Sequence, residues 1–131
     1  MSDSIHRPIE PEGIYRPASY AMGMVAAGRT LYVAGQVARD ADGALVGPND
    51  AEAQARQVYA NLGAVLAAAG AGPEHVVKIT TYLVDPTDGA AATAARLAFF
   101  DGHRPPHTGL VVAALGGPEV RLEVEVIAVL P

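Results

Sequence analysis

The sequence contains no cysteine and no tryptophan, and only 5% of its 131 residues are aromatic. Without cysteine the chain can form no disulfide, offers no thiolate nucleophile and cannot bind zinc through sulfur. Half of the residues are hydrophobic and alanine dominates, so the core must be built from small aliphatic side chains. A chain of this length suits one compact domain with a single core.

Positive charge is also scarce, because nine Lys and Arg stand against fourteen Asp and Glu, for a formal net charge of −5. An acidic chain is a poor partner for nucleic acid, since affinity for phosphate backbones rests on several cationic contacts. No uncharged apolar run reaches the roughly 20 residues of a membrane span, and the N-terminal MSDSIHRPIEPEG lacks the apolar segment of a signal peptide. We therefore expect a cytoplasmic protein that binds neither membranes nor nucleic acid.

The motifs that hold common cofactors are missing as well. No Gly-x-Gly-x-x-Gly, no phosphate-binding loop and no Gly-x-Ser-x-Gly elbow occurs in the sequence. RDADG superficially resembles a calcium loop, but the later ligands and the closing Glu are absent, so this segment is interpreted as a turn. We expect no cofactor.

Residues 1–19 contain prolines and charges of both signs, which favours an extended or partly ordered arm ahead of one domain over residues 20–131. The domain begins with two short apolar runs, AMGMVAAG and TLYVAGQV, separated by Gly28 and Arg29. A glycine-containing turn between two such runs is typical of a β-hairpin, so the two runs are expected to pair as neighbouring strands.

Two helices and three further strands are expected after this hairpin. They are a helix over 51–69, a strand over 75–84, a helix over 89–101, and strands over 109–115 and 120–130. Asn49 followed by Glu52 resembles a capping box for the first helix, and Asp88 offers a cap for the second. The positions expected to face the core are Val58, Leu62, Val65, Leu66 and Ala69 in the first helix, and Ala94, Leu97 and Phe100 in the second.

The order ββαβαββ predicts an α+β fold in which both helices pack on one face of a mixed sheet. Alternation in the last strand places Val120, Leu122, Val124, Val126 and Ala128 on one face. LYVAG, LVVAAL and VIAVL, however, are apolar at consecutive positions, which indicates that both faces of the sheet are buried. Because two helices cover only one face, we expect the other face to pack against further subunits.

Carboxylates and histidines are the candidates for chemistry. Glu123 and Glu125 share a face of the last strand, where spacing alone favours a solvated edge over a carboxylate that positions water in a cleft. His103 and His107 have the i, i+4 spacing of two helical metal ligands, but Pro105 and Pro106 exclude a regular helix through them. We therefore expect no metal site.

Several blocks of the sequence, in order, carry a resemblance to a known family. They are LYVAGQV, DADGALVG, AQARQVYANLGAVLAAAG, HVVKITTYLVD, AFFDGHRPPHT and VRLEVEVIAVL. Together they resemble the RidA/YjgF family of enamine and imine deaminases from about Tyr20 to Leu130. The resemblance implies a chorismate-mutase-like fold assembled as a homotrimer, with small-molecule clefts between the subunits.

The resemblance also implies roles for individual residues. His107 stands where active members carry an arginine that grips the carboxylate of a 2-imino acid, which marks this chain as a divergent member. Glu123 matches the carboxylate that orients the attacking water. Gly35 matches a residue whose backbone lines the cleft, and Tyr20 approximates a cleft tyrosine, although its spacing to Gly28 is one residue longer than usual. Thr93 stands where many members carry an asparagine.

The missing arginine leaves two functions open. Replacing a bidentate guanidinium by a mostly neutral imidazole weakens the hold on a carboxylate by roughly 10- to 100-fold, unless Arg104 or Arg121 substitutes for it. One hypothesis is a deaminase in which Glu123 positions water and His107 hydrogen-bonds the substrate or exchanges a proton with it. The other is a trimer without deaminase activity that binds a small metabolite or a protein partner in the same clefts. The ribonuclease role sometimes attached to the family is disfavoured by the acidic charge.

Overall fold

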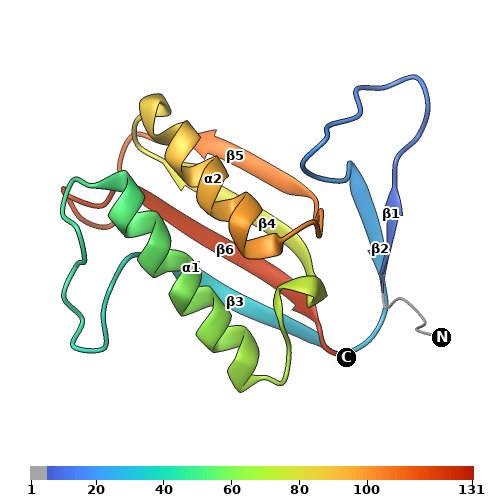
Figure 1. Cartoon of the computed structure of the whole chain (residues 1–131), viewed down its shortest axis with the longest axis horizontal. Coiled ribbons are helices and arrows are strands. Elements are labelled where there is room, and N and C mark those ends of the chain that lie inside the picture. The colour runs from blue at the N-terminus through green and yellow to red at the C-terminus, as the bar shows by residue number, and fades with distance from the viewer. Residues whose placement is uncertain (1–5) are drawn as a thin grey trace.

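The computed structural model describes residues 6–131 and confirms the expected α+β fold with a mixed sheet. The main sheet has the strand order β3-β6-β4-β5, in which β4 and β5 are parallel and the other neighbours antiparallel. Its strands are β3 (Thr30–Gln36), β4 (Val76–Leu83), β5 (His107–Val111) and β6 (Leu122–Val129). Helices α1 (Ala51–Ala68) and α2 (Gly89–Phe100) lie side by side on one face of this sheet (Figure 1).

The N-terminal region differs from the expectation. A strand β1 (His6–Ile9) lies within the segment expected to be an arm, and it pairs with β2 (Gly23–Ala26) in a separate two-stranded sheet beside the main one (Figure 1). The predicted hairpin between β2 and β3 is therefore wrong, as is the expectation that ordered structure begins near Tyr20. Gly28 has φ 134°, a conformation that favours glycine, and the chain turns there away from the plane of β3.

The helix boundaries agree with the sequence to within a residue, but both caps differ. The N-cap of α1 is Asp50, whose Oδ1 accepts the Ala53 N–H at 3.0 Å, whereas Asn49 has φ 60° and makes no capping bond. Asp88 does precede α2, yet its carboxylate does not cap that helix. The Asp88 carboxylate instead pairs with Arg121. The short 3-10 turn Pro86–Asp88 leads directly into the first turn of α2.

The buried face of α2 is only partly the predicted one. Phe100 is buried as predicted, but Ala94 and Leu97 are exposed, and Ala92 and Arg96 are buried instead. Both sets of positions have helical spacing, and an alanine-rich helix presents apolar residues on every side, so periodicity did not distinguish them. The consequence is that a guanidinium lies on the inner side of the helix.

The core lies between the two helices and the sheet. The alternation in β6 is confirmed, because Val120, Leu122, Val124, Val126 and Ala128 are all nearly inaccessible to solvent. Helix α1 contributes Val58, Leu62 and Leu66 to the same core. The opposite face of the sheet carries no helix, and Tyr32 on that face is 75% exposed. Neither helix found in residues 6–131 has the length and apolar character needed to cross a bilayer.

Candidate functional site

A cavity of about 250 Å³ lies between helix α2 and the edge strand β5. It is smaller than the roughly 300–1,000 Å³ typical of pockets for drug-sized ligands, which suits a small metabolite. Its lining comprises Thr81, Leu83, Pro86, Gly89, Ala92, Thr93, Arg96, His107, Gly109, Leu110 and Val111. Two of the residues predicted from the sequence, Thr93 and His107, therefore share one cavity.

His107 is the first residue of β5 and lies beside Ile79 of β4, so its side chain points to the helix-covered side of the sheet. Its Nε2 is 3.0 Å from Thr81 Oγ1. The ring of Tyr20 meets the imidazole edge-on, with centroids 5.8 Å apart. Gly109 leaves room for the imidazole, because a Cβ at this position would lie 3.2 Å from His107 Cε1. The structure thus brings Tyr20, Thr93 and His107 to one place.

The charge state of His107 differs from that of an ordinary surface histidine. Burial, together with the smaller effects of the positive charges of Arg96 and Lys78, lowers the pKa of His107 to about 4. The imidazole is therefore neutral at pH 7 and acts there as a hydrogen-bonding group rather than a cation. A role in proton exchange near neutral pH is correspondingly disfavoured.

This pKa predicts how stability depends on pH. In the unfolded chain His107 takes up a proton near pH 6.5, but in the folded chain only near pH 4. Between these values the unfolded state binds more protons, so the free energy of unfolding falls as the pH is lowered. Urea unfolding at pH 7 and pH 4.5 should show a loss roughly 1–3 kcal/mol larger in the wild type than in His107→Asn, which cannot take up this proton. Equal losses in the two proteins would contradict the assignment.

Arg96 is the residue in this cavity that sequence reasoning missed. Its side chain is only 5% exposed, and its guanidinium makes no hydrogen bond or ion pair with any residue in 6–131. Burial lowers the pKa of Arg96, but a guanidinium stays protonated at any pH at which the protein is folded. The available signal was the position of Arg96 four residues from both Ala92 and Phe100 on one side of an otherwise apolar helix.

The two arginines considered as substitutes are engaged elsewhere. The guanidinium of Arg104 donates to the backbone oxygens of Pro17, Ala18 and Tyr20 and forms an ion pair with Glu10. The pKa of Glu10 is lowered mainly by this hydrogen bond from Arg104. Arg104 therefore attaches the N-terminal loop to the segment that precedes β5 and does not line the cavity.

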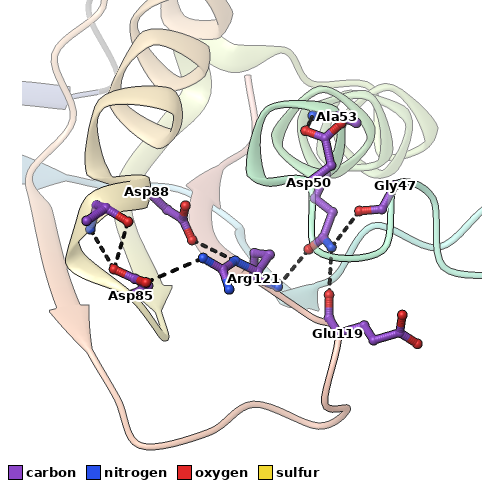
Figure 2. A network of polar contacts seen from close by, with 9 residues as sticks. Gly47, Asp50, Ala53, Asp85, Asp88, Glu119 and Arg121 are labelled. Atoms are coloured by element: carbon purple, nitrogen blue, oxygen red, sulfur yellow. Dashed lines mark hydrogen bonds and ion pairs between the residues drawn. The ribbon is translucent and has the colours of Figure 1, made fainter.

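Arg121 lies in a second polar network, near the N-terminal ends of α1 and α2 (Figure 2). Its Nε is 2.9 Å from Asp88 Oδ2, and its Nη2 is 3.6 Å from Asp85 Oδ2. The backbone N–H of Arg121 donates to Gln54 Oε1 at 2.8 Å. These contacts connect α1, the start of α2 and the start of β6, so the role of Arg121 is structural.

Glu123 and Gly35 lie together on the face without helices. A Cβ at Gly35 would overlap the Glu123 carboxylate, so glycine is what allows this carboxylate to lie against β3. The expected edge position of Glu123 and Glu125 is wrong, because β6 is a central strand with β3 and β4 on either side, although both residues are partly exposed. Tyr82 Oη donates to Glu125 Oε1, whereas the Glu123 carboxylate makes no hydrogen bond or ion pair within the described part of the chain.

The predicted site residues thus form two clusters on opposite faces of one sheet. Tyr20, Thr93 and His107 lie on the helix side, and Gly35 with Glu123 on the other. The strand register explains this division. Side chains alternate along a strand, so Glu123, between the buried Leu122 and Val124, points away from the core. His107 is paired with the buried Ile79 and therefore points to the same side of the sheet as the core.

His103 and His107 have separate hydrogen-bond partners. His103 Nε2 is 2.7 Å from the Val76 carbonyl oxygen, and His107 Nε2 is bonded to Thr81. Among residues 6–131 no group of three or more His, Asp or Glu side chains is arranged to hold a metal ion.

The chain is similar to a known protein family and to several known proteins. The family model described as Endoribonuclease L-PSP matches residues 13–130. The chain is similar to a RutC family protein of Synechocystis, with 40% identity over 122 residues that cover 92% of this chain and 89% of the relative. It is 37% identical over 101 residues to rat 2-iminobutanoate/2-iminopropanoate deaminase, covering 77% and 73% of the two chains. A Yersinia pestis protein of the conserved Rid family, described as of unknown function, superposes with a TM-score of 0.88 at 42% identity, covering 96% of this chain and 99% of that one.

Proposed function

The chain belongs to the RidA/YjgF family, whose model is described as Endoribonuclease L-PSP, and we propose that it hydrolyses a small reactive imine or enamine. In this reaction water adds to the carbon of the C=N bond and a proton goes to nitrogen. The resulting carbinolamine then expels ammonia and leaves a carbonyl compound. The relatives named 2-iminobutanoate/2-iminopropanoate deaminase support this class of reaction.

The observation that carries the proposal is the unengaged carboxylate of Glu123. A carboxylate that positions water must have a lone pair free for the water's proton, and Glu123 has no partner among residues 6–131. Its neighbour Glu125 instead accepts a hydrogen bond from Tyr82. Gly35 leaves the space in which the carboxylate of Glu123 lies. Glu123 is therefore the general base of this proposal.

One substrate can meet both clusters of site residues only where two copies of the chain adjoin. Glu123 and His107 lie on opposite faces of the sheet, so a cleft that contains both takes them from different subunits. The homotrimer with inter-subunit clefts implied by the family resemblance has this property. Tyr32 of β3 and Leu110 of β5 are exposed on the face without helices, which supports a further subunit packed on that face.

The proposal is tested by supplying the substrate in situ. A dehydratase that releases 2-iminobutanoate or 2-aminoacrylate is mixed with the protein, and keto-acid formation is followed. We expect catalytic amounts of the protein to accelerate keto-acid release over buffer and over heat-denatured protein, because hydrolysis in the cleft competes with the slower reaction in water. No acceleration with either substrate would contradict the proposal for simple imino acids.

The variant His107→Arg separates the two functions that the sequence left open. If the wild type is inactive and His107→Arg releases keto acid, the cleft is competent and residue 107 sets the substrate range. If neither protein is active, the result favours the alternative, a trimer that binds a small metabolite or a protein partner without deaminating it. RNA cleavage is the less supported activity, since the net charge of −5 opposes phosphate binding.

A further inference from the structure

We propose that Arg104 is a positioning residue for the imidazole of His107, because it holds the loop between β1 and β2 so that the ring of Tyr20 lies over that imidazole. The loop thereby keeps water away from His107. This inference goes beyond the proposed function and does not depend on it, since it concerns the protein before any substrate binds.

Arg104 binds mainly the backbone of this loop. Its Nε donates to the Ala18 carbonyl oxygen at 2.9 Å, and its Nη2 lies 2.8 Å from the Pro17 oxygen and 2.9 Å from the Tyr20 oxygen. In the reverse direction, the Ala21 N–H donates to the Arg104 carbonyl oxygen at 3.0 Å. Pro17 and Ala21 are buried. The part of the loop that is fixed to Arg104 is therefore the part that carries Tyr20.

Glu10, which directly follows β1, balances the charge of Arg104. Its Oε1 accepts a hydrogen bond from Nη2 at 2.5 Å, and its side chain is only 12% exposed. Arg16 pairs with the other carboxylate oxygen at 2.9 Å but is itself 68% exposed, so solvent weakens that pair. The hydrogen bond from Arg104 lowers the pKa of Glu10, so this carboxylate stays ionised throughout the pH range in which histidines titrate. Both ends of the loop are thus bound to one guanidinium.

Two prolines, Pro105 and Pro106, join Arg104 to His107. Pro105 is fully buried, and ring closure fixes the φ angle of each proline, so the connection is short and stiff. The Tyr20 ring meets the imidazole edge-on, with centroids 5.8 Å apart and an interplanar angle of 66°. One short segment therefore both anchors the loop and presents the side chain that the loop covers.

The covering ring contributes to the burial of His107, and burial is the largest cause of its lowered pKa. Arg96 from α2 and Lys78 from β4 lower the pKa less, and Tyr20 is the titratable side chain that meets the imidazole from the loop. In the proposed trimer, Glu123 of an adjoining subunit would raise this pKa, but alike in the wild type and in every loop variant. A change confined to the loop should therefore act on His107 through hydration.

The test is the titration of His107 in the full-length protein, followed by NMR at its ring carbon Cε1 between about pH 8 and pH 5, with His107→Asn to identify the signal. With a pKa of about 4, His107 should be only about a tenth protonated at pH 5 in the wild type. In Tyr20→Ala and in Arg104→Met we expect the midpoint to rise by about one pH unit or more, because water reaches the imidazole. Tyr20→Phe, which keeps the ring, should titrate as the wild type does.

Two substitutions in the exposed tip of the same loop are the matched controls. Tyr15 is 74% exposed, and Arg16 pairs with Glu10. Tyr15→Ala and Arg16→Met should leave the midpoint unchanged. Tyr20→Ala combined with Arg104→Met should shift the midpoint no further than Tyr20→Ala alone, because Arg104 acts through the ring. A purely structural role of Arg104 would lower the unfolding temperature and leave the midpoint at its wild-type value.

An unchanged midpoint in Tyr20→Ala, or in folded Arg104→Met, would overturn the inference, as would equal shifts in the two control variants. If Arg104→Met fails to fold, Arg104→Lys decides: its ammonium reaches fewer of the loop oxygens, so the midpoint should still rise, but by less. A wild-type midpoint in Arg104→Lys would then overturn the role of Arg104. None of these readouts involves turnover, so failure of the hydrolysis assay would leave the inference standing.

Discussion

Glu123→Gln should lower the rate of keto-acid release by roughly 100- to 10,000-fold, because an amide cannot accept the proton of the attacking water. The substitution keeps the size of the side chain, and Glu123 makes no hydrogen bond or ion pair within residues 6–131, so the fold should be nearly unaffected. The rate is measured with 2-iminobutanoate generated in situ, and thermal unfolding monitors the fold. Glu125→Gln, two residues away on the same face, should stay within a few-fold of the wild type.

Gly35→Ala provides a second route to the same conclusion. The added Cβ would overlap the Glu123 carboxylate, which lies at the end of a flexible side chain and can move aside at little cost in stability. A displaced base should slow hydrolysis by roughly 10- to 100-fold, and Gly35→Ala combined with Glu123→Gln should be no slower than Glu123→Gln alone. Gly63→Ala, where the new Cβ would make an ordinary contact with Phe99, is the matched control. Full activity in Glu123→Gln or Gly35→Ala would remove Glu123 from the proposed mechanism.

Gln54→Leu should lower the free energy of unfolding by about 3–5 kcal/mol. Gln54 is fully buried, and its amide donates to the backbone oxygens of Gly47 at 2.9 Å and Glu119 at 2.8 Å. Its Oε1 accepts the Arg121 N–H. Leucine fills nearly the same volume but leaves the Arg121 N–H without its partner, and an unsatisfied buried donor is costly. It also removes one hydrogen bond from each of the Gly47 and Glu119 oxygens, which keep only the N–H groups of Asp50 and Asn49. Urea unfolding at pH 7 gives the difference directly.

The neighbouring Gln57 supplies the control for this prediction. Gln57 donates only to Asn61 in the next turn of α1, so Gln57→Leu should change the free energy of unfolding by less than about 1 kcal/mol. Equal losses in the two variants would mean that the three segments joined by Gln54 are held together by other contacts.

The elements that the sequence predicted well are those with a long, unambiguous period. Strand β6 alternates from Leu122 to Ala128, and the spacing of Val58, Leu62 and Leu66 in α1 matches one helical face. The pairing of β2 with β1 was not predictable in this way, because it depends on the turn at Gly28 and not on hydrophobicity. Helix α2 is too rich in alanine for its inner face to be recognised, and the position of Arg96 was missed with it.

For the candidate site as well, the sequence indicated which residues to examine but not how they are arranged in space. The family resemblance selected Tyr20, Thr93 and His107, and in the structure Thr93 and His107 line one cavity while the ring of Tyr20 contacts His107. The resemblance did not indicate that Glu123 lies on the opposite face of the sheet from His107. The strand order and register determine the faces on which these two residues lie. The substitution at His107 drew attention to nearby arginines in sequence, yet the guanidinium in the cavity comes from another element.

Helix α2 contributes Gly89, Ala92, Thr93 and Arg96 to the cavity from successive turns, while its far side faces solvent. Substitutions at these positions change what the cavity presents to a ligand without altering the register of any strand. The sheet, whose side chains pack in the core, tolerates far fewer changes. Ligand preference can therefore diverge among related proteins through point mutations on one short helix, while the strands that define the fold are preserved.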